Sequence, residues 1–140
     1  MTDKEKRVLD FLKTQTLGVI STIDAKKNMP ESAVVAFAET ENLELIFGTF
    51  NDTRKYKNIQ TNARVAFVIG WQGITVQYEG EAHEASASLS SRYRYIQLAK
   101  NLGSKKYAFH DQQRYFKITP RWIRYSDFSF DPEKIFELTF

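Results

Sequence analysis

The sequence predicts a mainly β, α+β fold: a partly closed antiparallel barrel of roughly six to eight strands with about three helices. Short runs of β-branched and aromatic residues recur along the 140-residue chain and are separated by polar turns. The connections between the first three runs are too short to hold a crossover helix, so these strands pair antiparallel. Gly80 lies inside a long run, a position typical of a bulge or a barrel corner. A plain α+β sandwich is the alternative.

Length and composition indicate one soluble domain, residues 1–140. The net charge of +3 is too small to indicate a nucleic-acid-binding protein by itself. The chain has no cysteine, so it has neither a disulfide nor a thiolate metal site, and redox chemistry would need a cofactor. The charged N-terminal residues lack the apolar core of a signal peptide, and no apolar run is long enough to span a membrane. We therefore expect a cytoplasmic protein.

The first elements are a helix and a hairpin. Thr2 and Glu5 match a capping box, and apolar residues at helical spacing extend the helix over residues 3–14. Residues 17–23 and 30–39 form two strands around a polar turn. Period-two alternation places one set of side chains on one face and a second set, Val34 and Ala36, on the other. The first set is Ala33, Val35 and Phe37.

A third strand and a second helix follow. Residues 43–50 alternate in polarity and form the third strand. Asp52 or Thr53 caps a helix that ends near Thr61. The β-branched run at residues 63–70 predicts a strand that is buried on both faces.

The second half of the chain contains one more helix and several strands. Residues 74–85 form a long strand, and a helix capped by Ser88 or Ser90 ends at Gly103, its predicted C′ residue. Two strand-like segments, residues 114–120 and 121–128, are divided by Pro120. Residues 135–140 form the last strand.

The sequence gives little indication of a metal site or of a catalytic nucleophile. His83 and His110 are far apart in sequence and have no ligand partners at a recognised spacing, so His83 is assigned to the solvent face of its strand. No Gly-x-Ser-x-Gly motif is present, and the serines at residues 86–91 lie where helix caps are needed.

Cations crowd the predicted start of the second helix, where the helix dipole disfavours them. Thr49 ends a strand, and Thr53, Arg54 and Lys55 begin the helix, so backbone N–H groups, hydroxyls and two cations can converge on one anion. This pattern favours a phosphate site, and a solvated basic face is the alternative. The neighbouring run at residues 32–37 offers small side chains and backbone groups beside a planar ring, although these residues equally suit a core.

The order of these motifs resembles the pyridoxamine 5′-phosphate oxidase-like FMN-binding split barrels. The resemblance extends over about residues 3–120 and includes LGVISTIDAKKNMPESAVVAF, LELIFGT, TRKYKNIQTNARVAFVI and YEGEAHEAS. Its most specific part is a spacing of hydroxyl, basic and amide residues: Thr49, Arg54, Lys55, Asn58, Asn62 and Arg64.

The resemblance implies a split barrel that forms a homodimer, with two FMN sites at the subunit interface. It implies that Thr49, Arg54 and Lys55 contact the FMN phosphate and ribityl chain, and that the backbone of residues 34–36 (Val34, Val35 and Ala36) lies along the ring. Thr75 falls where the family often has a flavin-contacting glutamine, and Gln77 is the alternative if the register shifts by two. Trp122 approaches a flavin across the interface or is packed in the core.

Two departures from the family pattern are informative. Ala33 and Ala38 stand where the oxidases proper have an arginine and a lysine, which removes two cationic contacts to the cofactor. The C-terminal Arg-x-His that holds pyridoxal phosphate is absent, so oxidation of vitamin B6 is not expected.

These inferences predict an FMN-dependent oxidoreductase that passes electrons between a reductant and a small molecule. The alternatives are a carrier or sensor that binds FMN without turnover, a split barrel that binds haem or a deazaflavin, and a nucleic-acid-binding protein that uses the basic residues. The candidate substrate contacts are Tyr78, Arg124 and Tyr125.

Overall fold

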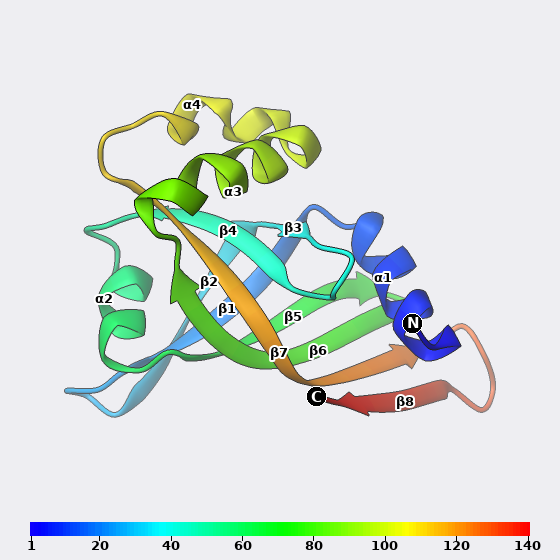
Figure 1. The fold of residues 1–140 in the computed structure, drawn as a ribbon. Helices are drawn as coiled ribbons and strands as arrows, with labels where there is room; N and C mark the ends of the chain where they lie inside the picture. The colour runs from blue at the N-terminus through cyan, green and yellow to red at the C-terminus, as the bar shows by residue number, and fades with distance from the viewer.

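The computed structural model describes all 140 residues and consists of one curled antiparallel sheet of eight strands. The strand order is β2-β1-β5-β6-β7-β4-β3, and β8 pairs with β7 outside this path. The sheet curls into a half-barrel with α3 and α4 above it and α1 and α2 near opposite ends (Figure 1). The predicted antiparallel barrel is therefore confirmed. No helix is both long enough and apolar enough to cross a bilayer.

The bounds of the elements agree with most of the predicted segments. The strands are β1 (Leu17–Asp24), β2 (Met29–Ala36), β3 (Ala38–Glu39), β4 (Leu45–Phe50), β5 (Arg64–Gln72), β6 (Ile74–Glu84), β7 (Gln113–Asp127) and β8 (Lys134–Thr139). The helices are α1 (Asp3–Lys13), α2 (Arg54–Thr61), α3 (Ala87–Lys100) and α4 (Lys105–Ala108), with a 3₁₀ turn at Leu102–Ser104.

Local capping defines the first two helices. Thr2 and Glu5 form the complete capping box of α1, in which each side chain accepts a hydrogen bond from the other residue's backbone N–H. Thr53 is the N-cap of α2, and its hydroxyl accepts from the Tyr56 N–H at 3.3 Å. Both caps were predicted from the sequence.

The core fills the concave side of the sheet. Val35 and Phe37 are buried in it, whereas the Val34 side chain is 62% exposed, so the predicted alternation along β2 is confirmed. β4 is buried on both faces, because Phe47 joins this core while Ile46 packs in a second cluster with Tyr93 of α3.

One predicted boundary is wrong, since β7 is a single strand of 15 residues with Pro120 inside it. Pro120 pairs with Gly80 at the point where the β6–β7 register shifts. A bulge is one of the few places where a strand tolerates a residue without an N–H donor. The bulge predicted at Gly80 is confirmed, and it also accommodates the proline.

Three further details of the prediction are corrected. β5 is not buried on both faces, because Val68 is 42% exposed. α3 begins after Ser86, not Ser88 or Ser90, and Gly103 lies in the 3₁₀ turn that precedes the unpredicted helix α4. The buried residues of α3 are Tyr93 and Gln97, a pair that apolar periodicity does not identify.

Candidate functional site

β2 is an edge strand of the sheet, at the split in the barrel, and some of its backbone groups have no strand partner. Its only strand partner is β1. The Phe37 N–H donates to the Thr16 carbonyl at 3.1 Å, and hydrogen-bonded pairs alternate along an antiparallel ladder. The backbone N–H and C=O groups of Val34 and Ala36 therefore point away from β1. The Ala36 carbonyl accordingly accepts a hydrogen bond from Gln97 of α3 at 3.0 Å.

A cavity of about 450 Å³ lies beside this edge and is here called the split cavity. It brings together four of the predicted site residues, Val34, Val35, Ala36 and Lys55. The remaining lining comes from the start of β1, β4, the C-terminal end of α3, the 3₁₀ turn, α4 and β7: Thr16, Leu17, Gly48, Gln97, Asn101, Gly103, Ser104, Tyr107 and Gln113. Edge-strand backbone, a lysine and several amides thus converge on one space.

Lys55 is the cation of the split cavity. Its side chain is half-buried, and burial lowers the pKa of its amine. None of the eight ion pairs in the chain includes Lys55. A half-buried cation without a carboxylate partner is suited to bind an anion, because the anion would compensate its lost hydration.

Thr49 lies next to the start of α2. Its side chain is buried, and its hydroxyl lies 2.9 Å from the Thr53 hydroxyl, which caps the helix. The Thr49 and Thr53 hydroxyls therefore order the turn that carries Lys55. Thr49 itself does not line the split cavity.

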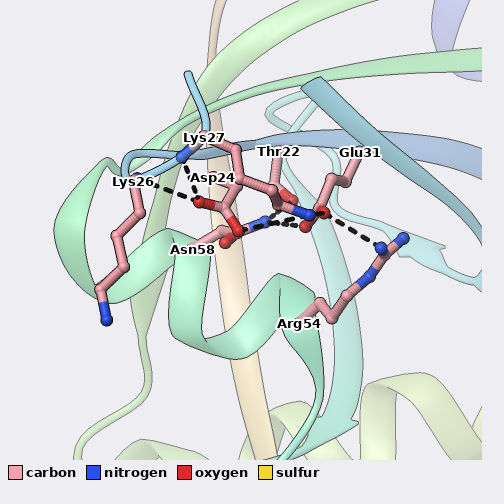
Figure 2. Close-up of polar contacts among 7 residues, drawn as sticks. All are labelled: Thr22, Asp24, Lys26, Lys27, Glu31, Arg54 and Asn58. Carbon is pink, nitrogen blue, oxygen red and sulfur yellow. Dashed lines mark hydrogen bonds and ion pairs between the residues drawn. The ribbon is translucent and has the colours of Figure 1, made fainter. Parts of the chain in front are cut away.

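Arg54 is engaged by a carboxylate of the chain itself. Its guanidinium lies 3.0 Å from Glu31 Oε2, and the same carboxylate accepts from Lys27 Nζ at 2.9 Å and Asn58 Nδ2 at 2.9 Å (Figure 2). Asn58 also donates to the Thr22 hydroxyl at 3.0 Å. We call Thr22, Lys27, Glu31, Arg54 and Asn58 the Glu31 cluster.

The Glu31 cluster explains why cations crowd the start of α2. The Glu31 side chain is 7% exposed, and the Asn58 hydrogen bond is the main reason that the pKa of its carboxyl is lowered, with Lys27 and Arg54 adding to the effect. The carboxylate near the helix N-terminus offsets the dipole penalty of Arg54. Sequence reasoning missed Glu31, whose only signal was a carboxylate at the start of a strand otherwise rich in small apolar residues.

The lowered pKa of Glu31 predicts acid sensitivity. Because the folded pKa lies below the ordinary value of 4.5, the cluster stabilises the fold fully above that pH and loses this contribution as pH falls through the folded value. Glu31→Gln should therefore flatten the fall in the free energy of unfolding between about pH 5 and pH 3. Chemical denaturation across this range measures it.

The matched control is Glu133→Gln, because Glu133 is exposed and makes no ion pair. It should leave the pH profile as in the wild type. Equal profiles for Glu31→Gln and the wild type would contradict a role for Glu31 in acid stability.

Thr75, Gln77 and Trp122 lie on β6 and β7 and do not line the split cavity of their own chain. Gln77 pairs with Val68 on β5 and Arg124 on β7. Their predicted contacts with a flavin stay predictions.

Two of the three candidate substrate contacts predicted from the sequence are ruled out by the structure. Tyr78 and Tyr125 are buried in the core, and the Tyr78 hydroxyl donates to the Leu43 carbonyl at 2.8 Å, so neither side chain is available to a substrate. Arg124 is paired with Glu137 at 3.2 Å. His83 is exposed, as predicted, and the chain has no cluster of potential metal ligands.

A family model described as pyridoxamine 5′-phosphate oxidase matches residues 5–127, most of the chain. The chain belongs to the pyridoxamine 5′-phosphate oxidase family. This confirms the resemblance inferred from the motifs, and the curled antiparallel sheet is the split barrel of that family. No curated protein matches the chain in sequence.

Solved structures share the fold at low sequence identity. General Stress Protein 26 from Bacillus anthracis is 20% identical with a TM-score of 0.74, and the match covers 98% of this chain and 100% of that one. PhzG from Burkholderia lata, in complex with tetrahydrophenazine-1-carboxylic acid, is 13% identical with a TM-score of 0.70 over 96% and 89%. A heme binding protein from Mycobacterium smegmatis is 12% identical with a TM-score of 0.79, over 96% of this chain and 56% of that one.

Proposed function

We propose that this family member binds FMN in the split cavity and passes electrons between a reductant and a small molecule. The observation that carries the proposal is the convergence on one cavity of Lys55, which has no ion pair, and the backbone groups of Val34 and Ala36 that point away from β1. A phosphate needs a cation, and the polar edge of a flavin ring needs backbone donors and acceptors. The lining supplies both kinds of group.

Each residue has a separate task in this proposal. Lys55 holds the phosphate, while the Thr49 and Thr53 hydroxyls fix the turn from which it projects. The backbone of β2 orients the ring, and Leu17 and Val35 exclude water from one side of it. The flavin supplies the electron-transfer chemistry when bound, and no side chain of the chain is assigned as an acid or base. A cytoplasmic location would suit a protein without cysteines that draws on cellular reductants.

The family fold also accommodates haem, as the heme binding protein from M. smegmatis indicates by its name. The split cavity favours FMN, because its lining contains no histidine, cysteine or methionine. These side chains are the usual axial ligands of haem iron, and Tyr107 is the one remaining candidate in the lining. PhzG, in complex with tetrahydrophenazine-1-carboxylic acid, shows that a protein of this fold binds a fused-ring compound.

A visible absorption spectrum tests the choice of cofactor. After incubation with FMN and removal of free flavin by gel filtration, the protein should retain the flavin bands at one FMN per chain. Retention of haem with a Soret band, without retention of flavin, would overturn the proposal. Bleaching of the bound flavin by reduced nicotinamide, followed by recovery with an acceptor, distinguishes an oxidoreductase from a carrier or sensor.

We further propose a homodimer formed through the convex face of the sheet. Val34, Val19 and Val68 lie directly opposite one another on β2, β1 and β5, and Gln77 continues the row. Both Val34 and Val68 are exposed, although the solvent face of an antiparallel sheet is ordinarily polar. Because Val34 also lines the split cavity, a partner on this face would cover the cavity.

A dimer through this face would bring Thr75, Gln77 and Trp122 near the split cavity of the partner subunit. Gln77 belongs to the valine row, and Trp122 pairs with Glu79 in the adjacent row. A residue of this face that cannot reach the cavity of its own chain can reach that of a two-fold partner. We therefore retain Thr75, Gln77 and Trp122 as proposed cofactor contacts across the interface.

Val68→Lys should break this dimer. Two-fold symmetry places two added charges in one apolar interface, so we expect the dimer dissociation constant to rise by about 100-fold. Light scattering coupled to size exclusion measures the mass. Phe128→Lys, at an exposed site in the turn after β7, is the control and should remain a dimer. A monomeric wild type, or an unchanged Val68→Lys dimer, would contradict this interface.

A further inference from the structure

One buried side-chain polar atom in the chain has no hydrogen-bond partner, the Oε1 of Gln97 on α3. The Gln97 residue is 4% exposed, so this oxygen has little contact with bulk solvent. Buried acceptors are almost always satisfied in folded proteins, and an exception calls for a physical reason.

The orientation of the Gln97 amide is determined by its other end. Gln97 Nε2 donates to the Ala36 carbonyl at 3.0 Å, and turning the amide over would place two acceptors against each other. One turn later on α3, Asn101 Nδ2 donates to the Phe37 carbonyl at 2.7 Å. These two bonds hold α3 against the end of β2 and leave Gln97 Oε1 as the free acceptor.

Gln97 lines the split cavity, together with the Val34–Ala36 edge and Lys55. Several potential donors share this lining, including Lys55, Asn101, Tyr107 and Gln113, yet none of them donates to Gln97 Oε1. No group of the chain therefore satisfies Gln97 Oε1, and a ligand in the cavity can supply the missing donor.

We infer that Gln97 Oε1 accepts a hydrogen bond from an N–H of the bound ligand and selects ligands that carry one. This inference rests on the proposed function, in which the ligand is a flavin. The imide N3–H of the flavin ring is the donor of the required kind. Gln97 is thus a specificity-determining residue for the heterocycle, separate from the cation that holds the phosphate.

The same acceptor disfavours ligands without a donor. A haem has no free N–H once its ring nitrogens hold iron, so its ring cannot donate to Gln97 Oε1. A site built around a hydrogen bond discriminates strongly against analogues that lack the matching group, because its buried polar atom is then left unpaired.

N3-methylated FMN tests the inference, since the methyl group removes the donor and leaves the phosphate unchanged. Binding of FMN and N3-methyl-FMN is measured by flavin fluorescence for the wild type, Gln97→Ala and the control Gln112→Ala, which changes an exposed glutamine. The wild type and the control should bind FMN about tenfold more tightly than the methylated analogue. Gln97→Ala should bind the two within about twofold of each other.

The ratio of the two affinities separates recognition from damage to the fold, because loss of the Ala36 contact weakens both ligands alike. Gln97→Leu serves the same comparison if the alanine variant does not fold. Equal affinities in the wild type, or an undiminished ratio without Gln97, would overturn the inference while leaving FMN binding intact. Failure of the wild type to bind either flavin would overturn both this inference and the proposed function.

Discussion

Replacing Lys55 by alanine is expected to weaken FMN binding by about 10- to 100-fold, which corresponds to the loss of one charge-assisted contact. Lys55 is the half-buried lysine of the split cavity, and no carboxylate of the chain pairs with it. An FMN phosphate would supply the missing counter-charge. Titration followed by flavin fluorescence, at fixed low ionic strength, measures the change in dissociation constant.

Two variants on the same helix make this prediction specific. Lys57→Ala removes an exposed lysine two residues after Lys55 on α2 and should leave the FMN affinity within about twofold, because surface charges are screened. Arg54→Ala should have a smaller effect than Lys55→Ala, because Arg54 is already paired with Glu31 and its side chain is 69% exposed. If Lys55→Ala binds FMN as tightly as the wild type, the phosphate is held elsewhere.

Gly80→Ala is expected to destabilise the fold by about 2 to 3 kcal/mol, a value typical of overpacking in a closely packed site. A Cβ at this position would lie 2.5 Å from the Thr119 carbonyl oxygen and 2.9 Å from Ile118 Cγ2. The first of these atoms belongs to the backbone, so no side-chain rotation relieves the contact. The bulge where β6 passes Pro120 of β7 would have to shift.

Thermal and denaturant unfolding measure this effect, and Gly103→Ala is the matched control. A Cβ at Gly103 has no atom within 4 Å, so this variant should be neutral or slightly stabilising. We expect the melting temperature of Gly80→Ala to fall by roughly 6 to 10 °C. Equal melting temperatures for the two variants would contradict the close approach of β6 and β7 at the bulge.

The Glu31 cluster and the split cavity divide two neighbouring cations between different tasks. Arg54 belongs to a network that joins α2 to β1 and β2 through Glu31, Asn58 and Thr22. Lys55, the next residue, lines the cavity. The basic pair that resembles a family phosphate motif therefore contains one residue that supports the structure and one that is available to a ligand.

The local features of the fold followed from the sequence, because they depend on neighbouring residues. The capping box at Thr2 and the Thr53 cap need only the residues of the next turn. The exposure of Val34 between buried Val35 and partly buried Ala33 follows from the period of a strand. The residues of the anion motif and the β2 strand were likewise identified before the structure, and four of them share one cavity.

Longer-range features did not follow, because periodicity does not say which distant residue a side chain meets. The sequence predicted that Pro120 ends a strand. In the structure β7 continues through Pro120, because Gly80, its partner on β6, lies at the bulge. The helix α3 was predicted from its cap and stop signals, which do not identify its contacts. The amides of Gln97 and Asn101 hold it against the end of β2.

By itself, the sequence determined the family, the antiparallel barrel and the position of a basic turn before α2, since motif spacing and alternation are properties of short segments. Only the tertiary structure decided the partners of the polar side chains. Glu31 meets Arg54, Gln97 meets Ala36, and Lys55 meets no carboxylate, because the curl of the sheet sets which segments come together. Ion pairs and hydrogen bonds form only between groups that the fold brings close together. Lys55 and Gln97 Oε1 have no such partner in the chain and are therefore available to a ligand.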